Sequence, residues 1–227
     1  MDEPTLIAAA QKGDREAFNQ LVVHYQGLAY NVAYRIVGDP DAAADATQDA
    51  FLSAYRAIAR FRGGSFRSWV LRIVTNTCYD QLRAKKRRPT TSLDADPDQD
   101  WEEWTVDEGE RPEEFSERQA LSEMLQRALQ ILPDDQRTVI VLSDVQGLRY
   151  NEISETLGVS LGTVKSRMNR ARRKLRDFMR ENEELLPARY RLQYKGGGVA
   201  GAISSCIDWI SDRFLNNVLH RRTNRYD

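Results

Sequence analysis

An acidic segment divides this chain of 227 residues, and no other feature limits the fold so strongly. Residues 91–117 contain twelve acidic side chains and one basic side chain, a net charge of −11. Prolines are frequent around this segment and aliphatic residues are few. Such a stretch buries too little apolar surface to offset the entropy of ordering it. We therefore expect a linker over residues 89–116, with a folded unit on either side.

The charge of the rest of the chain has the opposite sign. The whole chain has a net charge of −1, so the other 200 residues carry +10. Bases gather in one block at Lys85–Arg88 and in a second block at 165–176, which holds seven bases and no acid. A single charged run is usually a solvated helix face. Two basic blocks that flank an acidic segment favour nucleic acid as a partner.

Apolar residues recur at steps of three and four throughout both units, and no sustained alternation predicts a strand. We expect an all-α fold made of two small helical domains, a linker and a C-terminal extension. The expected boundaries are 1–88, 89–116, 117–182 and 183–227. The expected helices are 4–12, 14–37, 40–60, 66–87, 114–131, 134–146, 149–157 and 161–182. A first core is expected from Phe18, Leu21, Val22, Tyr25, Leu28, Ala29 and Val32.

Local signals support several of these boundaries. Asp39 suits a helix N-cap and Pro40 the first helical position. Gly63 and Gly64 predict a short loop between two helices. The chain has two cysteines and two histidines, Cys78, Cys206, His24 and His220, and their spacing supports neither a disulfide framework nor a metal site. Cys78 is expected to be a small buried hydrophobe.

Residues 150–176 predict a helix-turn-helix. Ile153 and Leu157 would face inward, Gly158 would permit the turn, Ser160 would cap the second helix and Val164 would pack it back. The N-terminal residues of such a second helix meet base edges, and later bases hold phosphates. The base-edge candidates are Thr163, Lys165, Ser166 and Arg167. The phosphate candidates are Arg170, Arg173 and Lys174.

The helix before the linker has a different composition. Between residues 61 and 88, aromatic side chains alternate with arginines and lysines. This mixture suits single-stranded nucleic acid, because bases stack on rings while cations follow the phosphates. Some of the rings must belong to the core, and Trp69 fits either role equally well.

These motifs resemble the sigma factors of the extracytoplasmic-function group of the sigma-70 family. "DATQDAFL" at 45–52 and "FRGGSFRSWVLRIVTNT" at 61–77 resemble the sigma-2 domain. "LPDDQRTVIVL" at 132–142 and the helix-turn-helix at 150–176 resemble the sigma-4 domain. The resemblance covers most of residues 5–180. It departs from the family at Ala44 and Ala46, where relatives often carry an acid and a larger aliphatic residue.

The resemblance implies a protein that binds core RNA polymerase, recognises promoter DNA as duplex and as melted non-template strand, and aids promoter opening. It implies no catalytic residue, cofactor or metal, and it allows for an anti-sigma partner. The implied polymerase-binding residues are Asp45, Gln48, Asp49, Phe51 and Leu52. The implied minus-ten residues are Phe61, Arg62, Gly63, Gly64, Ser65, Phe66, Trp69, Arg72, Asn76 and Arg83. The helix from residue 161 would read the minus-thirty-five element, and the linker would thread into polymerase channels.

Other interpretations stay open. A stand-alone helix-turn-helix regulator is the main alternative, and a nucleic-acid enzyme is a distant third because no phosphate loop or nucleophile–base pair is visible. No apolar run approaches the roughly 20 residues that cross a membrane, and no signal segment opens the chain, so we expect a cytoplasmic protein that associates with the nucleoid in the holoenzyme. The extension, with an amphipathic pattern from Val199 to Val218, would be a plain extension, a regulatory helix or a partner- or membrane-binding segment.

Overall fold

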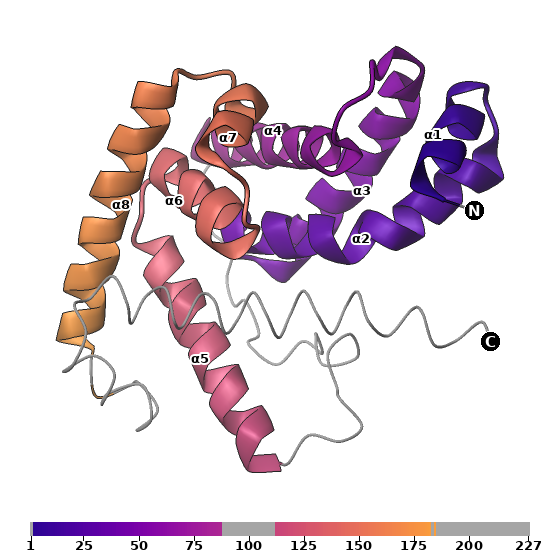
Figure 1. Ribbon diagram of the computed structural model, residues 1–227. Coiled ribbons are helices and arrows are strands. Elements are labelled where there is room, and N and C mark those ends of the chain that lie inside the picture. Colours follow the sequence, from indigo (N-terminus) through magenta and orange to yellow (C-terminus); the bar gives the residue numbers. More distant parts are fainter. Residues whose placement is uncertain (1, 88–111, 183, 185–227) are drawn as a thin grey trace.

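The structure is a computed structural model that describes residues 2–87, 112–182 and 184. Every regular element within these ranges is helical (Figure 1). The predicted all-α class is confirmed. None of the described helices is long and apolar enough to cross a membrane.

The first helical group precedes the acidic segment. It comprises α1 (Glu3–Gln11), α2 (Arg15–Val37), α3 (Pro40–Ala57), the 3₁₀ turn η1 (Ile58–Arg60) and α4 (Phe66–Arg87). The predicted helix 40–60 is therefore an α-helix only as far as Ala57, and its last three residues form the 3₁₀ turn. Asp39 caps α3 as expected, because its carboxylate accepts the backbone N–H of Ala42 at 2.8 Å.

The second helical group follows the acidic segment. It comprises α5 (Pro112–Gln130), α6 (Asp134–Ile140), the π-helical turn η3 (Val141–Val145), α7 (Tyr150–Leu157) and α8 (Leu161–Glu181). Helix α5 begins inside the predicted linker, where a proline followed by two glutamates suits a helix start. The predicted helix 134–146 changes to π geometry after Ile140, so that the N–H of Gln146 bonds the carbonyl of Val141.

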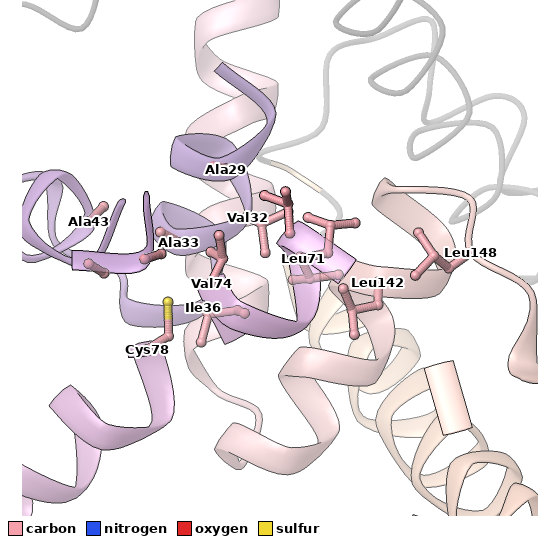
Figure 2. Packing of buried hydrophobic residues seen from close by; sticks show 14 of the residues in the cluster. Ala29, Val32, Ala33, Ile36, Ala43, Leu71, Val74, Cys78, Leu142 and Leu148 are labelled. Atoms are coloured by element: carbon pink, nitrogen blue, oxygen red, sulfur yellow. The ribbon is translucent and has the colours of Figure 1, made fainter. Parts of the chain in front are cut away.

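One continuous apolar core joins the two groups. Figure 2 shows Val32 and Ile36 of α2 and Leu71 of α4 gathered with Leu142 of η3 and Leu148, which belong to the second group. Residues 138–142 are all buried, so α6 and η3 are surrounded by other helices rather than packed on one face. The sequence predicted a core in each group but not their continuity.

Several predictions fall on other parts of the chain. Most of the linker, the tail with its amphipathic pattern, Cys206 and His220 lie outside the described residues. Among the residues that are described, no cluster of histidine, cysteine and carboxylate side chains could hold a metal ion.

Candidate nucleic-acid and polymerase interfaces

The loop before α4 depends on two glycines. Gly63 and Gly64 have φ values of +88° and +89°, in the region that side chains with a Cβ rarely adopt. A Cβ at either position would meet no other atom within 4 Å, so backbone conformation rather than space requires glycine here. The side chain of Gln11 in α1 holds the start of this loop, because its Nε2 donates to the carbonyl of Phe61 at 2.7 Å. The loop is therefore exposed, while its first residue is held in place by α1.

Aromatic rings support this loop. Phe66 is buried and packs against Phe61 and Trp69, with ring centroids 5.5 and 5.3 Å away. Phe61 and Trp69 lie 5.3 Å apart and stay partly exposed. Of the predicted minus-ten residues, Phe66 is therefore a core residue that supports the loop. Phe61 and Trp69 pack against Phe66 but are only partly buried, and their accessible faces could stack on a nucleobase.

The exposed face of α4 continues from this loop. Arg72, Asn76 and Arg83 all lie on it, and Ser65 caps the helix because its hydroxyl accepts the N–H of Ser68 at 3.1 Å. Arg62 and Ser65 are exposed beside them in the loop. The structure thus brings most of the predicted minus-ten residues onto one surface.

Helix-turn-helix geometry is present as predicted. Ile153 and Val164 are buried, and Gly158 has a φ of +63° at the turn. The hydroxyl of Ser160 accepts the N–H of Thr163 at 3.1 Å and caps α8. The inner face of α8 is a buried stripe of Met168, Ala171 and Leu175. Thr163, whose own hydroxyl bonds that of Ser160 at 2.8 Å, is half-buried.

The basic residues of α8 divide into two sets. The first set, Lys165, Arg170, Arg173 and Lys174, is exposed, and Ser166 is exposed beside it. Within this set, the guanidinium of Arg170 donates to the hydroxyl and carbonyl of Ser166, each at 3.2 Å, which orients it along the open face.

The second set pairs with acidic side chains of other elements. Arg167 Nε lies 3.0 Å from Asp135 of α6, and the Arg167 side chain is 22% exposed. Arg172 makes two hydrogen bonds to Asp144, at 3.2 and 2.8 Å, and these bonds raise its pKa. Arg167 was predicted to read bases; in this structure its side chain is largely buried and pairs with Asp135, which holds α8 against α6. Sequence spacing could not separate the two sets, because it does not show which side carries the acidic partners.

Sequence reasoning missed Asn169. This side chain is exposed on α8, one residue before Arg170 and three after Ser166. An asparagine amide can bond the N6 and N7 atoms of adenine in the major groove. Its spacing of three from Ser166 was the signal in the sequence that could have indicated it.

A third surface lies on α3. Asp45, Gln48, Asp49 and Leu52 are exposed along it, and Phe51 is half-buried. Leu52 is 49% exposed, and Tyr55, one turn further along, is 40% exposed. Tyr55 was not predicted, although it continues the same face. Ala46 is buried in the core and Ala44 is exposed, so the departures from the family pattern fall on different sides of α3.

Exposed tyrosines such as Tyr55 are enriched at protein–protein interfaces, so the α3 face is a candidate protein-binding face. A helix-turn-helix and an aromatic, basic helix on the same chain define a nucleic-acid-binding protein. The comparisons with known proteins give the family. The family model of Sigma-70 region 2 matches residues 21–88, and that of Sigma-70, region 4, matches residues 122–175.

Curated relatives agree with these matches. The chain is 37% identical to the ECF RNA polymerase sigma factor SigE of Mycolicibacterium smegmatis over 182 residues, which cover 78% of this chain and 69% of that protein. It is 38% identical to the ECF RNA polymerase sigma-E factor of Escherichia coli K12, over 76% of this chain and 91% of that protein.

A solved structure is also similar. CnrH, in complex with the cytosolic domain of CnrY, matches with a TM-score of 0.57 and 29% identity, over 80% of this chain and 99% of CnrH. The chain belongs to the extracytoplasmic-function RNA polymerase sigma factors of the sigma-70 family. Its function is promoter recognition in transcription initiation.

Proposed function

We propose that the three exposed surfaces divide the work of a sigma factor among them. The α3 face, from Asp45 to Tyr55, docks on core RNA polymerase. The loop 61–65 and the outer face of α4 hold the minus-ten element as single-stranded DNA. The outer face of α8 reads the minus-thirty-five element as duplex. The observation that carries this assignment is that one chain exposes both a stacking surface and a major-groove helix, with a separate protein-binding face.

Chemistry distinguishes the two DNA surfaces. Around Phe61 and Trp69, accessible ring faces lie beside Arg62 and Arg72, so an unpaired base could stack while a cation meets its phosphate. Extruding a base from duplex costs a few kcal/mol, which such contacts can offset. On α8 the exposed basic and amide side chains are not accompanied by an exposed aromatic ring. This composition suits contacts with the groove edges and phosphates of an intact DNA duplex.

We infer that the protein acts by recognition and that the chemistry of transcription belongs to the polymerase. It would act in the cytoplasm, on the nucleoid, when bound in the holoenzyme. An anti-sigma partner stays a prediction from the family resemblance. The structure of the relative CnrH does include a bound protein, the cytosolic domain of CnrY.

The assignment of α8 is tested by Arg170→Ala. The change should weaken transcription from a promoter with an intact minus-thirty-five element about 5- to 100-fold, the equivalent of about 1–3 kcal/mol for a lost base or phosphate contact. Transcription by reconstituted holoenzyme on a panel of promoters measures this effect. Arg180→Ala is the matched control, because Arg180 is exposed at the far end of the same helix and pairs only locally with Asp177. Equal activity of the two variants would contradict the assignment.

The assignment of α3 is tested by Asp49→Ala together with Tyr55→Ala. Both should weaken binding to core polymerase about tenfold each without changing the order of preference among promoters. Fluorescence titration of labelled protein with core polymerase measures the affinity. Asp41→Ala is the control, since Asp41 lies at the opposite end of α3. If the two variants changed promoter preference and left polymerase affinity intact, the face would have another role. Tight, specific duplex binding by the free protein would favour the stand-alone regulator instead.

A further inference from the structure

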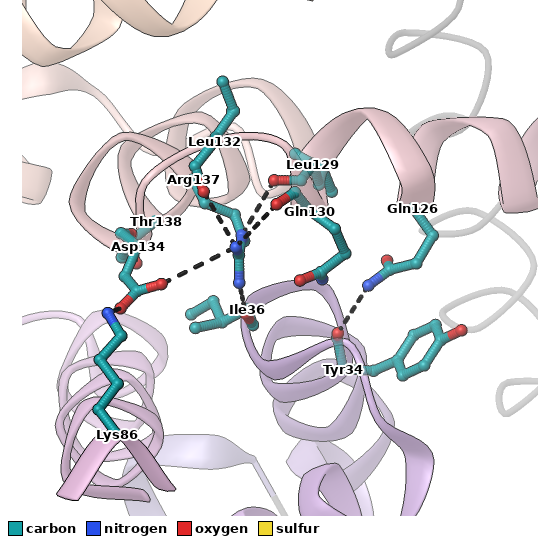
Figure 3. A network of polar contacts seen from close by, with 10 residues as sticks. All are labelled: Tyr34, Ile36, Lys86, Gln126, Leu129, Gln130, Leu132, Asp134, Arg137 and Thr138. Carbon is teal, nitrogen blue, oxygen red and sulfur yellow. Dashed lines mark hydrogen bonds and ion pairs between the residues drawn. The ribbon is translucent and has the colours of Figure 1, made fainter. Parts of the chain in front are cut away.

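Some side chains in this structure hold main-chain carbonyls of other elements. Arg137 of α6 is buried, and its Nε and Nη2 each donate at 3.0 Å, to Leu129 O and Leu132 O respectively (Figure 3). Both acceptors belong to buried residues at or just after the end of α5, so these bonds stabilise the core. Gln11 of α1 differs, because its acceptor is the carbonyl of Phe61, where the exposed loop before α4 begins.

Helix α1 carries Gln11 and is attached to α2 along its length. Leu6 and Ala10 are buried in the core, and the hydroxyl of Tyr25 in α2 donates to the carboxylate of Glu3. Gln11 is the last residue of α1 and is half-buried. The position of its amide therefore depends on how α1 packs on α2, and not on the residues around the loop.

The amide of Gln11 reaches the end of the 3₁₀ turn η1. Its Nε2 lies 2.7 Å from Phe61 O and 3.4 Å from Ile58 O, and the carbonyl of Ile58 also accepts the N–H of Phe61 at 3.0 Å. The bond to Phe61 is the stronger of the two, because 3.4 Å is long for an N–H···O bond. A neutral amide suits this half-buried place, where an unpaired cation would cost more to desolvate.

The two ends of the loop are held in different ways. At the C-terminal end, the hydroxyl of Ser65 accepts the N–H of Ser68, and its carbonyl accepts the N–H of Trp69, both at 3.1 Å. Both partners belong to the first turn of α4, directly after the loop. At the N-terminal end, the carbonyl of Phe61 is held by Gln11, which lies 50 positions earlier in the chain. Only this second contact depends on the tertiary structure.

Fixing the Phe61 carbonyl determines the direction in which the chain enters the loop. A peptide group is planar, so the carbonyl orients the whole bond between residues 61 and 62. The loop continues with Gly63 and Gly64, whose backbones can adopt many conformations. A loop that has to be ordered during binding holds its ligand more weakly, and ordering it beforehand reduces that cost.

We propose that Gln11 is a positioning residue for the capture of an unpaired base, an inference that rests on the function proposed above for the loop. Gln11 acts through the carbonyl of Phe61 and holds the loop in the arrangement that receives the base. Helix α1 thereby takes part in minus-ten recognition, although it precedes the residues that match the model of Sigma-70 region 2.

Relaxation NMR on the full-length chain tests the contact. Gln11→Met removes the donors and keeps the length of the side chain, and Gln20→Met makes the same change at an exposed position of α2. In Gln11→Met the backbone order parameters of Gly63 and Gly64 should fall below about 0.6, the range of a flexible backbone. The order parameter of Val74 within α4 should stay at about 0.85. Gln20→Met should leave all of these values as in the parent.

Binding of single-stranded DNA by reconstituted holoenzyme tests the consequence. The probe is the labelled single strand that the parent holoenzyme selects from a random pool. Gln11→Met should weaken its binding about 3- to 10-fold, because the loop then has to be ordered during binding. Gln20→Met should bind the probe as the parent does. Affinity for core polymerase should be the same in both variants.

A pH profile distinguishes a lost donor from a general loss of structure. Gln11→Glu keeps the size of the side chain, but an ionised carboxylate has no donor. The order parameters of Gly63 and Gly64 should be low at pH 7. They should recover as pH falls toward about 4.3, the ordinary pKa of a glutamate, because the protonated carboxyl again donates to Phe61. Gln11→Met should show no such recovery, and the same profile in both variants would overturn the inference.

Arg72→Ala separates this inference from the proposed function, because Arg72 is exposed on α4 and should contact a phosphate directly. If Arg72→Ala weakens binding of the probe while Gln11→Met leaves loop order or affinity as in the parent, the proposed function stands and the inference is overturned. If Gln11→Met loosens the loop and neither variant changes the affinity for the probe, the contact between Gln11 and the loop stands and the proposed function fails.

Discussion

At the scale of the residue, Cys78 shows how a buried group makes stability depend on pH. It is completely buried in α4 within the core shown in Figure 2, as predicted, and burial raises the pKa of its thiol from 9 to about 12. The folded protein thus keeps the thiol protonated at pH values where the unfolded chain has already released the proton. The stabilisation is complete below pH 9 and is lost as pH rises toward 12.

The resulting prediction concerns the alkaline range. From pH 9 upward, this thiol should lower the free energy of unfolding by up to about 1.4 kcal/mol per pH unit. Cys78→Ala should be less stable than the parent at pH 7 but should lose less stability between pH 8 and 10.5. Denaturant titrations at several pH values measure this difference in slope. An unchanged slope in Cys78→Ala would contradict the explanation.

At the scale of the element, α3 depends on its first turn. Its sequence is rich in alanine, and the helix carries the face that we propose for polymerase binding. Alanine favours the helix but supplies no side-chain bonds at its end, so Asp39 provides the cap. Order in the first turn should therefore depend on that carboxylate more than on the other acids of the helix.

Asp39→Ala should destabilise the protein by about 1 kcal/mol and should increase amide hydrogen exchange at Ala42 and Ala43. Asp41→Ala removes the same charge from the same turn without removing a capping bond, and a loss of only about 0.3–0.5 kcal/mol is expected. Equal losses would mean that charge at the helix end, rather than the cap, stabilises α3.

At the scale of the whole molecule, the shared core should make the two groups unfold together. Leu142 is fully buried and lies with Val32 and Leu71 of the first group (Figure 2). Leu142→Ala should cost about 2–5 kcal/mol, as for other buried leucines, and should reduce protection in α2 as well as in α6 and α8. Native-state hydrogen exchange measures all three helices at once. Ile131→Ala alters a side chain of the same group that is 46% exposed. It should change the free energy of unfolding and the exchange protection little. Loss of protection confined to the second group would show two independent cores.

Much of the fold was predictable because its signals are local. The period of apolar residues, the caps at Asp39 and Ser160 and the turn at Gly158 act within a few residues of chain, and the structure has each of them as predicted. The π-helical turn was not predictable, because it depends on burial from all sides. The exposed positions on α4 and α8 followed from helix spacing, but the roles assigned to them remain predictions.

The sequence by itself determined the helices, the helix-turn-helix and the family, because each depends on the order of neighbouring residues. Only the tertiary structure decided which cations pair with other parts of the protein. Arg167 and Arg172 bond acids of other elements in their own group, and Arg67 and Arg35 bond residues 79 or more positions away in the other group. Such partners are remote in the chain, so composition and spacing carry no record of them. Their pairing depends on how the helices pack. The same packing brings the two helical groups together around one core.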